Sequence, residues 1–225
     1  MNIKIIGLGG IGSVLAEKLG RFLNFYEYDS EIHVTLIDGD DYELKNLERQ
    51  EFFNFGNKAL VKCDELSTKF EFVKFSGLPY FVDQDTVQRL IENGDIVFIA
   101  VDNHKARKII SDRVKSLENV VVISGGNELL DGNIQIYLRK EGYDLTPTLT
   151  AYHPEIENPM DKLPSEMSCE ELSKSDPQIF FVNLGVATLM CWAFYNVIVR
   201  NETRYSEVYF DMSTMCADSK QRAVI

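Results

Sequence analysis

A glycine-rich turn between an apolar strand and a helix constrains the fold of this chain more than any other feature. The short apolar run Ile3 to Ile6 leads directly into Gly7-Leu-Gly-Gly-Ile-Gly12. Residues 13–25 then have apolar side chains at helical spacing on one side. In such units the first glycine permits a tight turn, the second lets a phosphate approach the backbone, and the third lets the helix pack on the strand. The pattern predicts a nucleotide site at Gly7, Gly9, Gly10 and Gly12, with a purely structural turn as the alternative.

The rest of the chain predicts an α/β fold. Further apolar strands are expected at 32–37, 71–75, 95–103 and 120–124. Helices are expected between them, at 59–69 and 85–93. Alternating strands and helices favour a parallel sheet, whereas the strands expected at 134–138, after an Asp131-Gly-Asn turn, and at 205–212 favour antiparallel pairing. We therefore predict a Rossmann-like, mostly parallel sheet with helices on both faces and an antiparallel C-terminal extension.

The length of 225 residues suits one large α/β domain. We divide it into a nucleotide-binding part (1–140), a crossover-type loop (141–175) and a C-terminal helix and strand (176–225). The apolar segment 179–199 resembles a membrane span, but Asn183 and Asn196 interrupt it. We expect a helix that is buried in the core or in a dimer interface.

Charge and cysteine content narrow the partners and the compartment. The net charge of −12 argues against non-specific binding to nucleic acid or to an anionic membrane. Cys63, Cys169, Cys191 and Cys216 are widely scattered and form no CxxC pair. We therefore expect no structural zinc and no disulfide framework, and a cytoplasmic protein. The chain opens as a strand, so no signal peptide is expected.

A polar stretch after the strand at 32–37 supplies further candidate ligand groups. Asp38 is the first acid after the apolar run, and Asn46 and Arg49 follow one and two helical turns later. The carboxylate can accept hydrogen bonds from ribose hydroxyls, and a guanidinium fits a phosphate bidentately. Lys58, near the N-terminus of the next helix, is unfavourable for the helix dipole and indicates an anionic ligand. A solvated loop is the alternative reading of this stretch.

A second acid follows the buried strand at 95–103. This strand ends in Asp102 and Asn103, and Arg107 lies on the helix expected next. Ligands of open parallel sheets bind beyond the carboxyl ends of the strands, so Asp38 and Asp102 should face one crevice. The alternative is that Asp102 only caps the next helix.

One cysteine lies in a sequence typical of a helix start. Ser168 and Glu171 fit a capping box, which places Cys169 in the first helical turn, where the helix dipole lowers the pKa of a thiol. The neighbouring glutamates act in the opposite direction. Cys169 is the best candidate for a thioester- or persulfide-handling thiol, and an unreactive, partly exposed cysteine is the alternative. Cys191 is expected in the core.

Taken in order, these motifs resemble the ThiF/MoeB/HesA superfamily of adenylating enzymes, which are related to ubiquitin-activating enzymes. The resemblance covers about residues 3–138. Its motifs are Gly7 to Gly12; Asp38-x-Asp40 with Asn46-Leu-Glu-Arg49-Gln50; Lys58; Asp102-Asn103 with Arg107; Ser124-Gly125; and Asp131-Gly-Asn-Ile134. The segments 164–169 and 176–183 resemble a small plasmid-associated, PRTRC-type branch.

The resemblance implies ATP- and magnesium-dependent adenylation of a C-terminal glycine carboxylate. The acceptor would be a small ubiquitin-like or sulfur-carrier protein, and thioester formation on Cys169 could follow. It also implies a homodimer through the helix at 176–200. The resemblance implies that Asp38 binds the ribose, with Asp40 beside it, and that Asp102 binds magnesium. It implies phosphate binding by Arg49 and Lys58, with Lys62 as the alternative lysine. Asn46 and Asn103 would support these phosphate- and nucleotide-binding groups.

Three other functions remain open from the sequence. An NAD-dependent oxidoreductase explains the glycines and Asp38 but leaves Asn46, Arg49 and Asp102 without roles. A nucleotide-binding scaffold without catalysis would keep the same motifs. Within the superfamily, a short peptide or a tRNA base carboxylate could be the acceptor, although the acidity of the chain disfavours tRNA.

Overall fold

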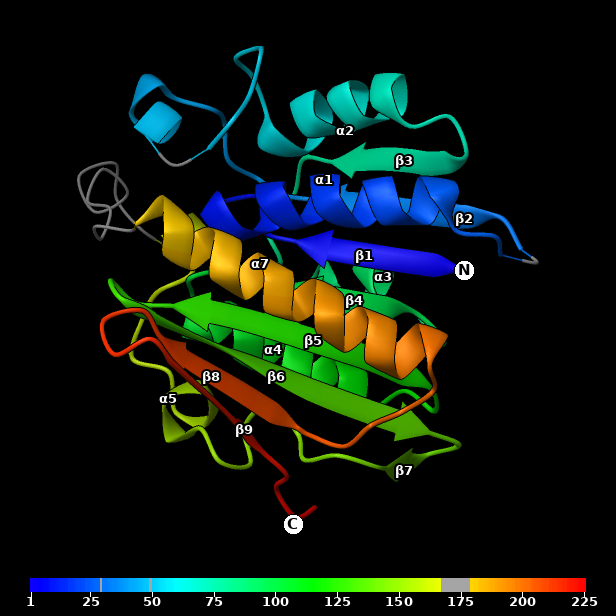
Figure 1. Ribbon diagram of the computed structural model, residues 1–225, viewed down its shortest axis with the longest axis vertical. Coiled ribbons are helices and arrows are strands. Elements are labelled where there is room, and N and C mark those ends of the chain that lie inside the picture. The colour runs from blue at the N-terminus through cyan, green and yellow to red at the C-terminus, as the bar shows by residue number, and fades with distance from the viewer. Residues whose placement is uncertain (29, 49, 167–178) are drawn as a thin grey trace.

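The computed structural model describes residues 1–28, 30–48, 50–166 and 179–225, and its strands form one twisted sheet (Figure 1). The strands of these residues are β1 (Asn2–Ile6), β2 (Ile32–Ile37), β3 (Val73–Leu78), β4 (Ile96–Ile99), β5 (Val120–Asn127), β6 (Asp131–Lys140), β7 (Tyr143–Asp144), β8 (Glu207–Asp211) and β9 (Cys216–Lys220). Their order is β3-β2-β1-β4-β5-β6-β8-β9, and β7 pairs with β6.

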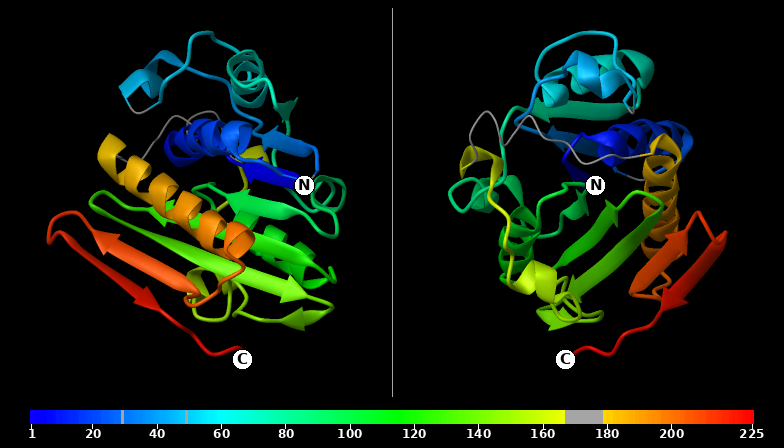
Figure 2. Two further views of the ribbon diagram at one scale, coloured as in Figure 1. Left: turned by 45° about the vertical axis from the view of Figure 1, so that its right-hand side comes forward. Right: turned by 90° about the vertical axis from the view of Figure 1, so that its left-hand side faces the viewer.

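Helices cover both faces of the sheet (Figure 2). Among the described residues the α-helices are α1 (Gly10–Phe25), α2 (Lys58–Lys69), α3 (Val87–Leu90), α4 (His104–Lys115), α5 (Pro154–Glu157) and α7 (Phe180–Phe194). Two 3-10 turns, η1 (Leu44–Glu48) and η2 (Pro164–Glu166), and a π-helical end of α7, η3 (Tyr195–Val199), complete the list. Successive strand residues point to opposite faces, so Ile3 and Ile5 pack with α1, α2 and α7, and Ile6 packs with α3 and α4.

The pairing confirms the predicted fold class. Strands β3, β2, β1, β4 and β5 are parallel neighbours, whereas β6, β8 and β9 continue the sheet in antiparallel pairing. From β1 the chain adds strands first on one side, through β2 and β3, and then on the other, through β4 and β5. The carboxyl ends of β1 and β4 therefore flank the point where the direction of winding reverses, which is where ligands bind in such sheets.

Several boundaries differ from the sequence prediction, among them the buried strand expected at 95–103, of which only Ile96–Ile99 forms β4. The strand expected at 71–75 runs from Val73 to Leu78, and the helix expected at 85–93 is reduced to the single turn of α3. Asp131-Gly-Asn opens β6 and is not the turn, because Gly132 already pairs with Asn127 and the hairpin loop precedes it. The crossover-type loop expected at 141–175 contains regular structure, namely β7 and α5.

The sequence did not predict a strand in the polar C-terminal tail, but residues 216–220 form β9. Four of the five side chains of β9 are exposed, so no apolar alternation marks it in the sequence. Backbone pairing with β8 holds β9 in the sheet. The amino-acid composition of a strand does not predict such pairing.

The apolar C-terminal helix lies across the sheet beside α1 (Figure 1). Val186, Met190 and Phe194 are buried in the core on that face. The described helical residues Phe180–Val199, 20 in number with a mean hydropathy of 1.6, are long and apolar enough to cross a membrane by length and composition. In this structure they instead bury one side against β5, β6 and α1.

Candidate functional site

In the glycine turn after β1, Gly7 and Gly12 lie against neighbouring backbone, whereas Gly9 faces open space. Gly7 has a φ of +88°, and a Cβ there would lie 2.8 Å from the carbonyl carbon of Ala100. A Cβ on Gly12 would lie 1.8 Å from the carbonyl oxygen of Gly7, so only glycine lets α1 approach the strand. A Cβ on Gly9 would meet no atom within 4 Å. The backbone at Gly9 is therefore accessible to a ligand, as a phosphate-binding turn requires.

The start of α7 packs against the same turn. A Cβ on Gly10 would lie 2.2 Å from Nδ2 of Asn183, a fully buried side chain of α7. In the sequence, Asn183 stands out only as an interruption of an apolar helix. A lone amide in such a helix was the available signal that this position lies near a polar site.

The carboxylate of Asp38 lies at the carboxyl end of β2 and binds the glycine turn directly. Its Oδ2 accepts a hydrogen bond from the backbone N–H of Leu8 at 2.6 Å, and its Oδ1 accepts one from the N–H of Asp40 at 2.8 Å. The residue is 8% exposed, and burial raises the pKa of this carboxyl group, while the nearby Lys58 cation acts in the opposite direction. Each carboxylate oxygen has a second lone pair, so Asp38 retains the capacity to accept from a hydroxyl.

Of the two candidate lysines, the structure favours Lys58. Its Nζ lies 3.1 Å from Oδ2 of Asp40, and its cation interacts with the buried Asp38. Lys62 donates instead to Oε2 of Glu65 at 2.6 Å and to the backbone oxygen of Glu51 at 2.8 Å. Lys62 therefore joins α2 to the preceding loop, and Lys58 is the lysine that faces the two aspartates.

Asn57 holds these groups in place and was missed in the sequence. Its Nδ2 donates to the carbonyl oxygens of Asp38 and Asp40, both at 3.0 Å. Its Oδ1 accepts from the N–H groups of Ala59 and Leu60 and so caps α2. One amide thus fastens the start of α2 to the loop after β2. The signal available in the sequence was an asparagine directly before a helix.

Asn46 is buried, and its side chain shapes the loop rather than projecting freely. Its Oδ1 accepts from the N–H of Glu43 at 2.8 Å, and its carbonyl oxygen accepts from the N–H of Gln50 at 2.9 Å. These bonds close the 3-10 turn η1. Arg49, predicted to hold phosphate, lies outside the described residues, and its role stays a prediction.

At the end of β4 the structure separates the roles of two neighbours. Asp102 is exposed and forms no hydrogen bond or ion pair with another described residue. Asn103 is buried and caps α4: its Oδ1 accepts from the N–H of Ala106 at 2.8 Å, and its Nδ2 donates to the carbonyl oxygen of Lys162. The alternative reading of Asp102 as the helix cap is therefore wrong, because Asn103 fills that place. The engaged side chain of Asn103 supports the edge rather than reaching into it.

The described residues contain no cluster of three or more histidine, cysteine or acidic side chains that could enclose a metal ion. Magnesium commonly binds through only one or two carboxylates, with water and substrate phosphates as its other ligands. A single exposed carboxylate at Asp102 therefore fits a magnesium ion that arrives with a nucleotide, and does not fit a metal held by the protein alone.

A segment of the crossover loop is fastened beside Asp102. The carboxylate of Asp161 accepts from the N–H groups of His104 at 2.6 Å and Lys105 at 3.0 Å, at the start of α4. The side chain of Lys105 in turn contacts the carboxylate of Glu166 at 2.7 Å. This contact between distant segments was not predicted, because the loop has no periodic pattern.

Comparison with known protein families identifies the family to which this chain belongs. The model of the ThiF family matches residues 1–222. The chain belongs to the ThiF family. This agrees with the resemblance seen in the sequence, while the finer PRTRC-type branch is not shown.

Related sequences match only part of their own length. The chain is 28% identical over 149 residues to the adenylyltransferase and sulfurtransferase MOCS3 of Culex quinquefasciatus, covering 63% of this chain and 31% of that protein. It is 29% identical over 143 residues to MOCS3-1 of Zea mays, covering 60% and 28%. The match thus spans less than a third of each relative.

Solved structures of the same fold align over nearly the whole chain. Escherichia coli MccB with ATP has a TM-score of 0.76 at 17% identity, covering 99% of this chain and 64% of that one. PaaA has a TM-score of 0.67 at 19% identity, covering 98% and 63%. At these identities the likeness shows the ThiF-type fold.

Of the two cysteines singled out in the sequence, Cys191 lies among the described residues of this ThiF-family chain. Cys169 and the capping box of Ser168 and Glu171 lie outside the described residues, as does the expected helix start at Asp176. Cys191 is half-buried against the core on α7, and burial raises the pKa of its thiol to about 11. A thiol with so high a pKa is mostly protonated at neutral pH and is a poor nucleophile.

Proposed function

We propose that this chain adenylates a carboxylate by using ATP and magnesium. The observation that carries the proposal is the convergence of four groups at one edge of the sheet. They are the open backbone at Gly9, the buried carboxylate of Asp38, the cation of Lys58 and the exposed carboxylate of Asp102. Backbone and lysine suit the phosphates, Asp38 suits the ribose, and Asp102 suits the metal.

Adenylation of a carboxylate requires that the reactants be positioned and that the phosphate charge be neutralised. It does not require a general base. An acceptor carboxylate is already ionised at neutral pH. Its oxygen would form a bond to the α-phosphorus of ATP while the bond from that phosphorus to the pyrophosphate oxygen breaks. Lys58, helped by Arg49, would stabilise the negative charge on the phosphates during this exchange. Magnesium, held in part by Asp102, would neutralise further phosphate charge.

We propose as the acceptor a small ubiquitin-like or sulfur-carrier protein that ends in glycine. The relatives named above as adenylyltransferase and sulfurtransferase support an acceptor that takes part in sulfur transfer. Solved structures of the MccB fold contain MccA, which keeps a short acceptor open as the alternative. A subsequent thioester on Cys169 stays a prediction.

The site favours this proposal over an oxidoreductase. A dinucleotide enzyme needs the glycine turn and Asp38, but it has no use for a lysine held against the aspartates or for an exposed acid at Asp102. A non-catalytic scaffold would retain nucleotide binding without transfer. Measurements of nucleotide binding and of transfer distinguish the adenylating enzyme from the scaffold.

Calorimetric titration of the purified chain tests the nucleotide. We expect binding of magnesium with AMPCPP, a non-hydrolysable ATP analogue, and loss of that binding in Asp38→Ala. Asp112→Ala is the matched control, because Asp112 is exposed two turns into α4 and pairs with Lys108. Binding of NADH in place of AMPCPP would contradict the proposal.

Exchange of labelled pyrophosphate into ATP tests the chemistry. The probes are a sulfur-carrier protein ending in Gly-Gly and the same protein with a C-terminal amide. We expect exchange of pyrophosphate into ATP only in the presence of the carrier protein with a free C-terminal carboxylate. Nucleotide binding without exchange, in wild type and in Asp102→Asn alike, would support the scaffold.

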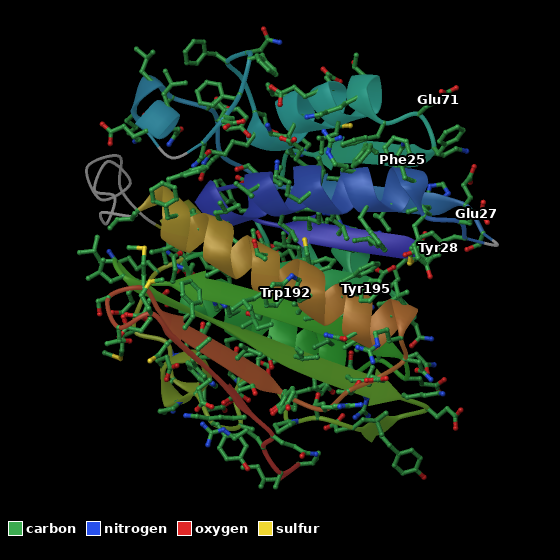
Figure 3. The ribbon with its side chains drawn as sticks, in the orientation of Figure 1. Phe25, Glu27, Tyr28, Glu71, Trp192 and Tyr195 are labelled. Carbon is green, nitrogen blue, oxygen red and sulfur yellow. The ribbon has the colours of Figure 1, made fainter. Side chains whose placement is uncertain are left out.

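The homodimer through α7 stays a prediction, and exposed aromatic side chains on this helix support it. Trp192 of α7 and Tyr195 of η3 are exposed, on the side of the molecule that also bears Phe25, at the end of α1, and Tyr28 (Figure 3). Trp192, on the outer side of α7, is 62% exposed. If this face joins two copies, Trp192→Glu should halve the mass in light scattering, whereas Tyr143→Glu, also an exposed aromatic, should not.

A further inference from the structure

A buried arginine joins the ends of two strands at the candidate site. Arg107 of α4 is 7% exposed. Its Nη2 donates to the carbonyl oxygens of Val101 and Gly125, and its Nη1 donates to Oγ of Ser124, each at 2.6 Å. Val101 follows β4 and directly precedes Asp102, and the other two acceptors belong to β5. The planar guanidinium therefore fixes the spacing between these strand ends.

The charge of Arg107 has no paired carboxylate among the described residues, because all of its acceptors there are neutral. Burial lowers the pKa of this guanidinium to about 10, and the charges that act against this are Asp102 first, then Asp161 and Glu155. A buried cation with neutral partners is costly for the folded protein. Asp102, which is exposed at the end of β4, is its strongest electrostatic partner.

We propose that Arg107 is a positioning residue that couples magnesium to nucleotide binding through Asp102. It would act by holding the backbone of Val101, so that Asp102 meets a metal bound to the phosphates, and by adding positive potential where those phosphates lie. This inference rests on the proposed function. It adds that the arginine on α4, which touches no ligand itself, sets the metal dependence of the site.

A purely structural clamp would look similar in the unliganded protein, so the test must separate stability from metal coupling. Arg107→Lys keeps the charge but loses the planar fork, and Ser124→Ala removes one acceptor and leaves the arginine in place. Arg113→Lys is the matched control. Arg113 lies on the same helix and also donates from two nitrogens to a backbone oxygen, that of Ile91, away from the site.

The measurement is the ratio of the AMPCPP dissociation constants without and with magnesium, determined by calorimetry for each variant. In the wild type we expect magnesium to tighten binding by about tenfold or more. Arg107→Lys and Asp102→Asn should each bring this ratio close to one, and the double variant should lower it no further, because both changes interrupt one coupling. Ser124→Ala should lower the ratio partially, and Arg113→Lys should leave it unchanged.

The possible failures are distinct. An unchanged ratio in Arg107→Lys, with only a lower melting temperature, would show a structural clamp and overturn the inference. Effects of Arg107→Lys and Asp102→Asn that multiply would overturn the link through Asp102. If Arg107→Lys does not fold, an unchanged ratio in Ser124→Ala is the overturning result. Absence of AMPCPP binding by the wild type would overturn the proposed function itself, and this inference with it.

Discussion

The side-chain amide of Asn57 donates a hydrogen bond to the carbonyl oxygen of Asp38 at 3.0 Å, across 19 residues of sequence. The same side chain caps α2 and is followed directly by Lys58. Asn57 therefore sets the distance between the buried carboxylate and the lysine at the candidate nucleotide site.

Replacing Asn57 by aspartate should weaken ATP binding. Aspartate retains an acceptor oxygen for the two N–H groups at the N-terminus of α2, but it loses the Nδ2 donor to Asp38 and Asp40 and places a charge against their carbonyl oxygens. We expect about a tenfold loss of affinity, the equivalent of one or two hydrogen bonds, by calorimetry. Asn93→Asp is the control, since Asn93 acts as an acceptor for Glu118 and Asn119 far from the site. Equal affinity in Asn57→Asp and wild type would refute the positioning role.

The glycine turn should respond differently at two positions. Gly12→Ala places a methyl group against the carbonyl oxygen of Gly7 and should destabilise the protein by about 1–3 kcal/mol or more in denaturant unfolding. Gly9→Ala has room and should keep or slightly raise stability, by about 0.4–1 kcal/mol. It should nevertheless weaken ATP binding, because the methyl group occupies the approach to the backbone. Normal ATP affinity in Gly9→Ala would show that phosphate binds elsewhere.

The two lysines of α2 should separate binding from stability. Lys58→Met should lower ATP affinity by about tenfold or more, because a charge-assisted contact with phosphate is lost. Lys62→Met should instead lower the melting temperature, because it leaves the largely buried Glu65 without its cation. Calorimetry and thermal unfolding on both variants test this assignment, and the reverse pattern would move the phosphate contact to Lys62.

The C-terminal tail should loosen in acid. Glu207 is buried, which by itself raises the pKa of its carboxyl group, but hydrogen bonds from Arg222, His153 and Tyr209 outweigh burial and hold that pKa below its ordinary 4.5. A lowered pKa in the folded state stabilises the protein above pH 4.5, and this stabilisation is lost as the pH falls through the lowered value.

Melting temperatures measured from neutral pH down to pH values below 4.5 test this dependence. The wild type should lose stability more steeply than Glu207→Gln in the acidic range, whereas Glu118→Gln, at an exposed glutamate, should follow the wild type. Parallel curves for the wild type and Glu207→Gln would contradict the role assigned to this carboxylate.

Much of the fold could be predicted from local patterns. The strand at 32–37 has the predicted bounds, and the turn between β1 and α1 follows from glycine sterics within a few residues. Asp38 and Asp102 could be assigned to one edge because strand direction in a parallel sheet is a topological rule. These features depend on neighbours in sequence, or on an apolar period, and both are visible in the chain.

Only the tertiary structure decided which polar side chains are engaged. Asn103, not Asp102, caps α4; Asn183 reaches the glycine turn from a distant helix; and Arg107 binds carbonyl oxygens of two strands. β9 is ordered by pairing alone, with no apolar face to announce it. The sequence by itself determined the sheet, its glycine turn and the acids at its edge, because burial and backbone sterics act through residue type. The partner of a buried hydrogen-bonding group is determined by what the fold brings within about 3 Å of it, and residue type does not encode that distance.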